Sequence, residues 1–169
     1  MPNQISLVDI ADYHRDAEAS LRLYFSQTNP DYAARFATYL PSEVNEELAE
    51  RISETDIRSA LVVMARIEAA FRIDYKERCM RKMSDDISIE FRKLFKNSGE
   101  KARLDEDIWN MWCEKSDPSV RVIISQLRSA FRFRHWIAHG RHWNVGNRYD
   151  FQDIYLLADT VFSGFPLCG

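Results

Sequence analysis

Hydrophobic positions in this chain recur every three or four residues over long stretches, which is the spacing of one face of an α-helix. Five glycines and five prolines in 169 residues leave few turns, and the periodic stretches are too long for strands. The pattern predicts helices at about residues 7–26, 31–40, 42–53, 56–82, 84–97, 104–115, 119–139 and 151–162. We expect an all-α, up-and-down helical bundle.

Local signals set the ends of several predicted helices. Pro41 is expected to end one helix and Ser42 to cap the next. Asp117 followed by Pro118 is a helix start, and Gly140 is placed to stop that helix. The length suits one domain over residues 1–169, with a core bundle at 55–163 and an N-terminal helical extension at 1–50.

The helix predicted at 119–139 carries an arginine in its apolar stripe. Arg134 lies about 20° from the centre of that stripe, where a core-facing helix normally has leucine. The stripe consists of Val120, Ile123, Ile124, Leu127, Ala130 and Phe131. Since a buried, unpaired guanidinium is costly, we expect a carboxylate partner, a wet cleft or an anionic ligand. Glu68 is the candidate partner, although it can instead pair with Arg72 at i+4 on its own helix.

Positive charge is concentrated in the same part of the sequence. No Asp or Glu occurs between Asp117 and Asp150. The segment holds six arginines, namely Arg121, Arg128, Arg132, Arg134, Arg141 and Arg148. Because the whole chain carries −3 and this segment +6, the rest carries −9. An acidic protein with such a segment is expected to attract phosphate groups.

Two histidines accompany Arg134 at the end of this helix. His135 and His139 are four residues apart and therefore share a face. An imidazole can accept a proton near neutral pH, and RNA carries its own nucleophile, the 2′-hydroxyl. A base beside a phosphate-binding arginine therefore needs neither a metal nor a covalent intermediate to cleave RNA. The residues after the helix that can follow an RNA backbone are Arg141, His142 and Arg148.

The segment Arg134-His135-Trp136-Ile137-Ala138-His139 resembles the R-x4-6-H signature of the HEPN superfamily. A polar residue after the arginine and a closing Ala-His-Gly, both typical of that signature, are present here as His135 and 138–140. The specific match covers about seven residues, and the helical layout extends it loosely over 55–163.

The resemblance implies a helical bundle and a metal-independent endoribonuclease without cofactors, with Arg134, His139 and His135 as catalytic residues. It also implies a homodimer whose two motifs line one cleft, and RNA products with 2′,3′-cyclic phosphate and 5′-hydroxyl ends. HEPN proteins are frequently toxins with an antitoxin or effectors of antiviral defence with a partner protein, and some bind RNA without cleaving it.

Two other functions remain open. His135, His139 and His142 have an H-x3-H-x2-H spacing that suits a metal hydrolase, but Trp136 stands where a zincin has its glutamate and the arginines repel a cation. The second alternative is a noncatalytic RNA- or protein-binding module with the same fold. Trp136 and Trp143 could stack on bases, although such tryptophans more often fill a core or a dimer interface.

The remaining features concern the location of the protein, the state of its cysteines and the exposure of His14. The first residues lack a basic start and an apolar run, and no stretch approaches 18 consecutive apolar residues, so we expect a cytoplasmic protein without a membrane segment. Cys79, Cys113 and Cys168 are odd in number and far apart, which favours reduced thiols over a disulfide or zinc framework. His14, among charged residues, is expected to be exposed.

Overall fold

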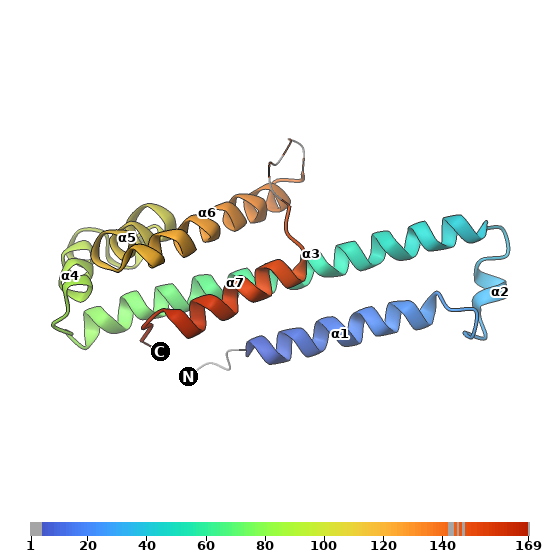
Figure 1. The fold of residues 1–169 in the computed structure, drawn as a ribbon, viewed down its shortest axis with the longest axis horizontal. Helices are drawn as coiled ribbons and strands as arrows, with labels where there is room; N and C mark the ends of the chain where they lie inside the picture. The colour runs from blue at the N-terminus through green and yellow to red at the C-terminus, as the bar shows by residue number, and fades with distance from the viewer. Residues whose placement is uncertain (1–4, 142–143, 145, 147, 169) are drawn as a thin grey trace.

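A 40-residue helix, α3 (Pro41–Met80), forms the long axis of the computed structural model, which describes residues 5–141, 144, 146 and 148–168. The other elements lie along α3 or at its end (Figure 1). They are α1 (Leu7–Tyr24), α2 (Tyr32–Arg35), α4 (Asp86–Ser98), a 3-10 turn η1 (Gly99–Lys101), a π-helical segment η2 (Leu104–Trp109), α5 (Asn110–Lys115), α6 (Pro118–Ala138) and α7 (Phe151–Gly164). The described residues contain no strand, which confirms the predicted all-α bundle.

The prediction of two separate helices at 42–53 and 56–82 is wrong, because α3 runs through both ranges without a break. The segment between them has no glycine or proline. The Thr55 hydroxyl donates a hydrogen bond to the Arg51 carbonyl (2.9 Å), so this polar side chain is satisfied inside the helix and does not end it. The boundary expected near residues 50–55 therefore falls within one continuous helix.

The start of α3 also differs from the prediction. Pro41 is the first residue of the helix, where its fixed φ and missing N–H are tolerated. Leu40 is the N-cap in place of Ser42, and its backbone N–H donates to the Glu43 carboxylate (2.6 Å). The helix expected at 31–40 is the short α2.

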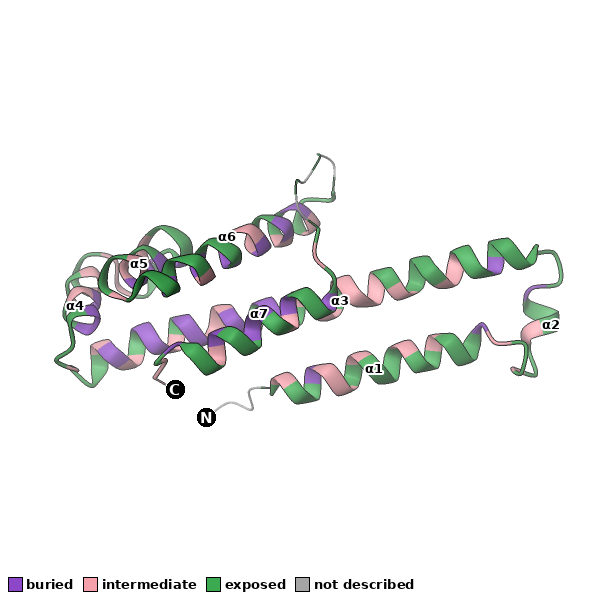
Figure 2. Ribbon diagram, viewed as in Figure 1, coloured by how far each residue is buried: buried purple, intermediate pink, exposed green. Residues whose placement is uncertain are grey.

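Two hydrophobic clusters hold the molecule together. The large one packs α3 against α4, η2, α5, α6 and α7, with fully buried members such as Met64, Phe71, Trp109 and Ile154. The small one consists of Phe25, Phe36 and Val44 and joins the end of α1, α2 and the start of α3. The first half of α3 and α1 thus form a hairpin that extends beyond the bundle, and Figure 2 shows it as mostly exposed.

The helix that carries the motif, α6, has the ends that the sequence predicts. The Asp117 side chain accepts a hydrogen bond from the Ser119 N–H (2.9 Å), and Pro118 occupies the first turn. The helix ends at Ala138, and Gly140 follows with φ +83°, a conformation in which an L side chain is strained. The prediction of α7 is also confirmed, with Asp150 as its N-cap.

The buried line of α6 does not follow the predicted stripe to its end. It consists of Val120, Ile124, Leu127, Ala130, Phe133 and Trp136. Because later members are three residues apart, the line winds around the helix. Trp136 is therefore buried against Phe133, with ring centroids 5.6 Å apart, and is not placed to stack on bases. Trp143 lies outside the described residues.

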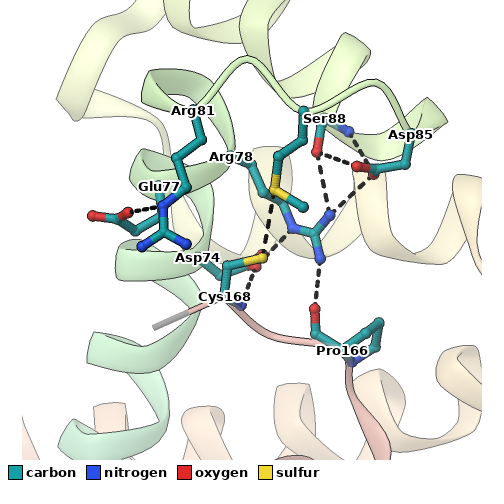
Figure 3. A network of polar contacts seen from close by, with 9 residues as sticks. Asp74, Glu77, Arg78, Arg81, Asp85, Ser88, Pro166 and Cys168 are labelled. Carbon is teal, nitrogen blue, oxygen red and sulfur yellow. Dashed lines mark hydrogen bonds and ion pairs between the residues drawn. The ribbon is translucent and has the colours of Figure 1, made fainter.

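A buried arginine near the end of α3 holds the C-terminal segment (Figure 3). Arg78 donates to the Asp74 carboxylate (2.7 Å) and to the Pro166 carbonyl (2.5 Å). It also bonds to Asp85 (3.0 Å) and Ser88 (3.2 Å) at the start of α4. The network links three parts of the chain that are far apart in sequence.

Asp74 is the most deeply buried acid in this network. Its Oδ1 also accepts the Cys168 N–H (2.9 Å), whereas Oδ2 is buried without a hydrogen-bond partner in the described part of the chain. Burial raises the pKa of this carboxyl, while the bonds from Cys168 and Arg78 act in the opposite direction. Arg78 therefore stabilises the negative charge of the buried Asp74 carboxylate.

None of the helices in the described ranges has both the length and the apolar composition needed to cross a membrane.

Candidate functional site

The predicted motif lies at the C-terminal end of α6 and faces α3 on one side. The sequence pattern places Arg134 in the apolar stripe and so predicts that it is buried. In the structure, 42 % of its side chain is exposed, so this prediction is wrong. Its Nη1 lies 3.2 Å from Oε2 of Glu68 on α3. The expected carboxylate partner is therefore confirmed, and the guanidinium also has access to solvent.

Glu68 contacts both of the arginines that the sequence offered as its partners, Arg134 and Arg72. Its Oε1 accepts a hydrogen bond from Nε of Arg72 (2.9 Å), one turn further along α3, while Oε2 faces Arg134. Arg72 in turn donates to the Ala102 carbonyl (3.1 Å), which fixes it against the segment before η2. One carboxylate thus contacts two arginines, each through a different oxygen.

The two histidines of the motif lie together on an exposed edge of α6. The ring centroids of His135 and His139 are 4.1 Å apart, and their planes are inclined by 52°. The His139 N–H donates to the His135 carbonyl (3.1 Å), and His139 is the C-cap of the helix. The predicted juxtaposition of the rings is confirmed.

The positive charge of the segment is partly compensated by carboxylates from elsewhere in the chain. Arg128 bonds to Asp105 of η2 (2.5 Å) and to Asn110 (2.6 Å). Arg134 pairs with Glu68, and Arg141 pairs through both of its terminal nitrogens with Glu54 of α3. Three of the six arginines thus have acidic partners, so the local positive field is weaker than the sequence alone indicates.

The arginines after α6 lie around Trp136. The guanidinium of Arg148 is 5.4 Å and that of Arg141 6.0 Å from the Trp136 ring. The hydrogen bond from Arg141 lowers the pKa of Glu54, and the same bond raises the pKa of Arg141. Arg141 is thus engaged with α3, and both Arg141 and Arg148 are exposed. His142 lies outside the described residues, so its predicted RNA contact stays a prediction.

His14 was expected to be exposed, and this is wrong. Its ring is stacked on Phe151 (3.9 Å between centroids), and only 11 % of its side chain is accessible. Nδ1 lies 3.1 Å from the Ser59 hydroxyl, and Nε2 lies 3.4 Å from the Asp56 carboxylate. His14 therefore ties α1 to α3 and to the first residue of α7. Its partners are more than 40 positions away, so no local pattern indicates this role.

The metal alternative requires three ligands close together. Among the described residues, no group of three His, Cys, Asp or Glu side chains is placed to hold a metal ion. The third histidine of the H-x3-H-x2-H spacing, His142, is not among them. Sequence reasoning also missed Glu54 and Asp105, because they lie 87 and 23 positions from the arginines that they bind.

Comparison of the chain with protein-family models, with curated proteins and with solved structures finds no match. The resemblance to the HEPN superfamily therefore depends on the sequence motif and the helical layout.

Proposed function

We propose that this protein is a metal-independent endoribonuclease of the HEPN type. The observation that carries the proposal is the exposed pair His135 and His139, with rings 4.1 Å apart, on a helix end whose Arg134 is half exposed and held by Glu68. A base, a second imidazole and a fixed cation are the groups that cleavage by the 2′-hydroxyl needs.

In the proposed reaction His139 takes the proton of a ribose 2′-hydroxyl, and the 2′-oxygen attacks the adjacent phosphorus. The bond from phosphorus to the 5′-oxygen breaks, and protonated His135 supplies the proton for that oxygen. The products are a 2′,3′-cyclic phosphate and a 5′-hydroxyl. Arg134 stabilises the additional negative charge on the phosphoryl oxygens as the 2′-oxygen attacks.

The ion pair with Glu68 is compatible with this role of Arg134. A guanidinium has five N–H donors, and the contact with Glu68 is made through Nη1. Glu68 acts as a positioning residue, because a carboxylate that fixes the guanidinium reduces the entropy lost when phosphate binds. Arg141, His142 and Arg148 are proposed to contact the RNA backbone beyond the cleaved bond.

A second candidate is a noncatalytic RNA- or protein-binding module with the same fold. It is favoured by the carboxylate partners of Arg128, Arg134 and Arg141, since ion pairs of this kind also occur in purely structural roles. Cleavage of RNA distinguishes the two candidates.

The test of the proposed function is incubation of the purified protein with RNA oligonucleotides of mixed sequence in the presence of EDTA. We expect cleavage that chelator does not reduce, and mass spectrometry of the products should find cyclic phosphate ends. The same oligonucleotides with 2′-O-methyl groups throughout are the control, because they lack the nucleophile and should stay intact. Cleavage only with an added divalent cation would falsify the mechanism, and binding without cleavage would support the noncatalytic module.

We further propose that the protein acts in the cytoplasm as a homodimer whose two motifs line one cleft, with an antitoxin or a defence protein as its regulator. The expected result of sedimentation equilibrium on the purified protein is a mass close to twice the 19.9 kDa of one chain. A mass of one chain at concentrations at which RNA is cleaved would rule out the dimer as a requirement for activity.

A further inference from the structure

One exposed face of α6 carries a continuous line of cationic and polar side chains. The line consists of Arg121, Ser125, Arg128, Arg132, His135 and His139, with alternating spacings of four and three residues. At 100° per residue they fall within a sector of about 80°, and the line is about 27 Å long. We call it the α6 basic stripe.

The stripe is open to solvent. Arg128 is partly buried and the other five members are exposed. The buried line of α6, from Val120 to Trp136, lies on other faces of the helix, and Figure 2 shows exposed positions along the length of α6.

Neighbouring elements hold two members of the stripe in place. Nε of Arg121 donates to the Cys113 carbonyl of α5 (2.9 Å), and Arg128 bonds to Asp105 and Asn110. Arg132 lies between these anchored arginines and the histidine pair. The stripe is therefore a partly fixed surface that begins at the proposed catalytic end of α6 and leads away from it.

The chemistry of the stripe favours a polyanion as its occupant. It has no aliphatic side chain that could pack against an apolar helix. A second copy laid along the whole length of the stripe would bring its arginines against those of the first. Arginine and serine side chains are typical contacts of a nucleic-acid backbone, and Trp109 and Trp136 nearby are buried and cannot stack on bases.

We propose that the α6 basic stripe binds the phosphate backbone of one RNA strand and leads it from the His135 and His139 pair toward Arg121. This inference rests on the proposed function, since it takes the strand to be the substrate. A length of about 27 Å corresponds to about eight nucleotides at the stacked rise of about 3.4 Å per nucleotide. The far end of the stripe therefore contacts long substrates and not short ones.

The three arginines of the stripe do not contribute equally to the attraction for phosphate. Asp105 neutralises Arg128, so Arg121 and Arg132 supply most of the attraction. Each phosphate neutralised on a single strand contributes about 0.7 to the slope of log affinity against log salt concentration. Loss of both arginines should lower this slope by about 1.4.

The experiment measures binding by fluorescence anisotropy on the full chain, with a labelled 12-nucleotide RNA that carries 2′-O-methyl groups and therefore stays intact. The test variant is R121Q/R132Q. The matched control is R22Q/R51Q, which removes the same charge from exposed arginines of α1 and the first half of α3. R132Q alone is the second variant, because Arg132 is exposed whereas Arg121 also supports α5.

We expect R121Q/R132Q to weaken binding of the 12-mer at least tenfold at low salt and to lower the salt slope. The control should bind the 12-mer as the unchanged protein does, and R132Q should lose less affinity than R121Q/R132Q. Cleavage of an unmodified three-nucleotide RNA should be the same in all variants, since it reaches only the histidine end.

The outcomes separate this proposal from the proposed function. If R121Q/R132Q binds the 12-mer as tightly as the control, the stripe is not an RNA track, even if RNA is cleaved. If no RNA is cleaved but binding depends on Arg121 and Arg132, the nuclease proposal fails and the track stands. If the 12-mer does not bind and polyglutamate binds through the same two arginines, the occupant is an acidic protein and the RNA track is overturned.

Discussion

Replacement of His139 by alanine should lower the rate of RNA cleavage by about 10²- to 10⁴-fold, the usual contribution of a positioned general base. RNA affinity should change little, because His139 carries one exposed imidazole at the end of α6 whereas the arginines supply most of the attraction. The measurement is single-turnover cleavage with protein in excess, together with binding of the uncleavable 12-mer.

The control is Gln152→Ala on the exposed side of α7, which should cleave RNA at the normal rate. Arg134→Ala belongs to the same series and should also lose cleavage. Its fold should survive, because Glu68 keeps the hydrogen bond from Arg72. A rate that His139→Ala leaves unchanged would remove this histidine from the mechanism.

The largest expected effect on stability comes from Arg78. Replacement by methionine should lower the free energy of unfolding by about 3–5 kcal/mol, as for other buried ion pairs that lose one partner. The substitution removes the guanidinium that faces Asp74, which is fully buried, and it also removes the bond to the Pro166 carbonyl. Urea unfolding followed by circular dichroism measures the difference.

Arg81→Met is the matched control, because the exposed Arg81 directly follows α3 and pairs with Glu77 one turn before it (Figure 3). An ion pair whose arginine is exposed to solvent contributes little, so this variant should unfold close to the unchanged protein. The double variant Asp74→Leu and Arg78→Met should recover much of the loss, since it no longer buries an unpaired charge. Equal losses for the Arg78 and Arg81 variants would contradict the role assigned to the network.

The end of α6 illustrates how far the sequence alone predicts the site. Asp117 and Pro118 start the helix and Gly140 follows its end, and each acts only on the adjacent turn. His135 and His139 lie side by side because a separation of four residues places two side chains on the same face of a helix. The sequence offered Glu68 as the partner of Arg134, and the ion pair is present. It did not predict Glu54 and Asp105, which lie 87 and 23 positions before Arg141 and Arg128.

Hydrophobic periodicity determined by itself that the chain is all-α, and a short capping signal determined where α6 begins. These features depend on residues a few positions apart, whose geometry a helix sets. Only the tertiary structure decided that Trp136 is buried and that Arg78 holds the C-terminal segment. Such features depend on which helix faces pack together, and a repeat of 3.6 residues does not specify the neighbour that each face meets.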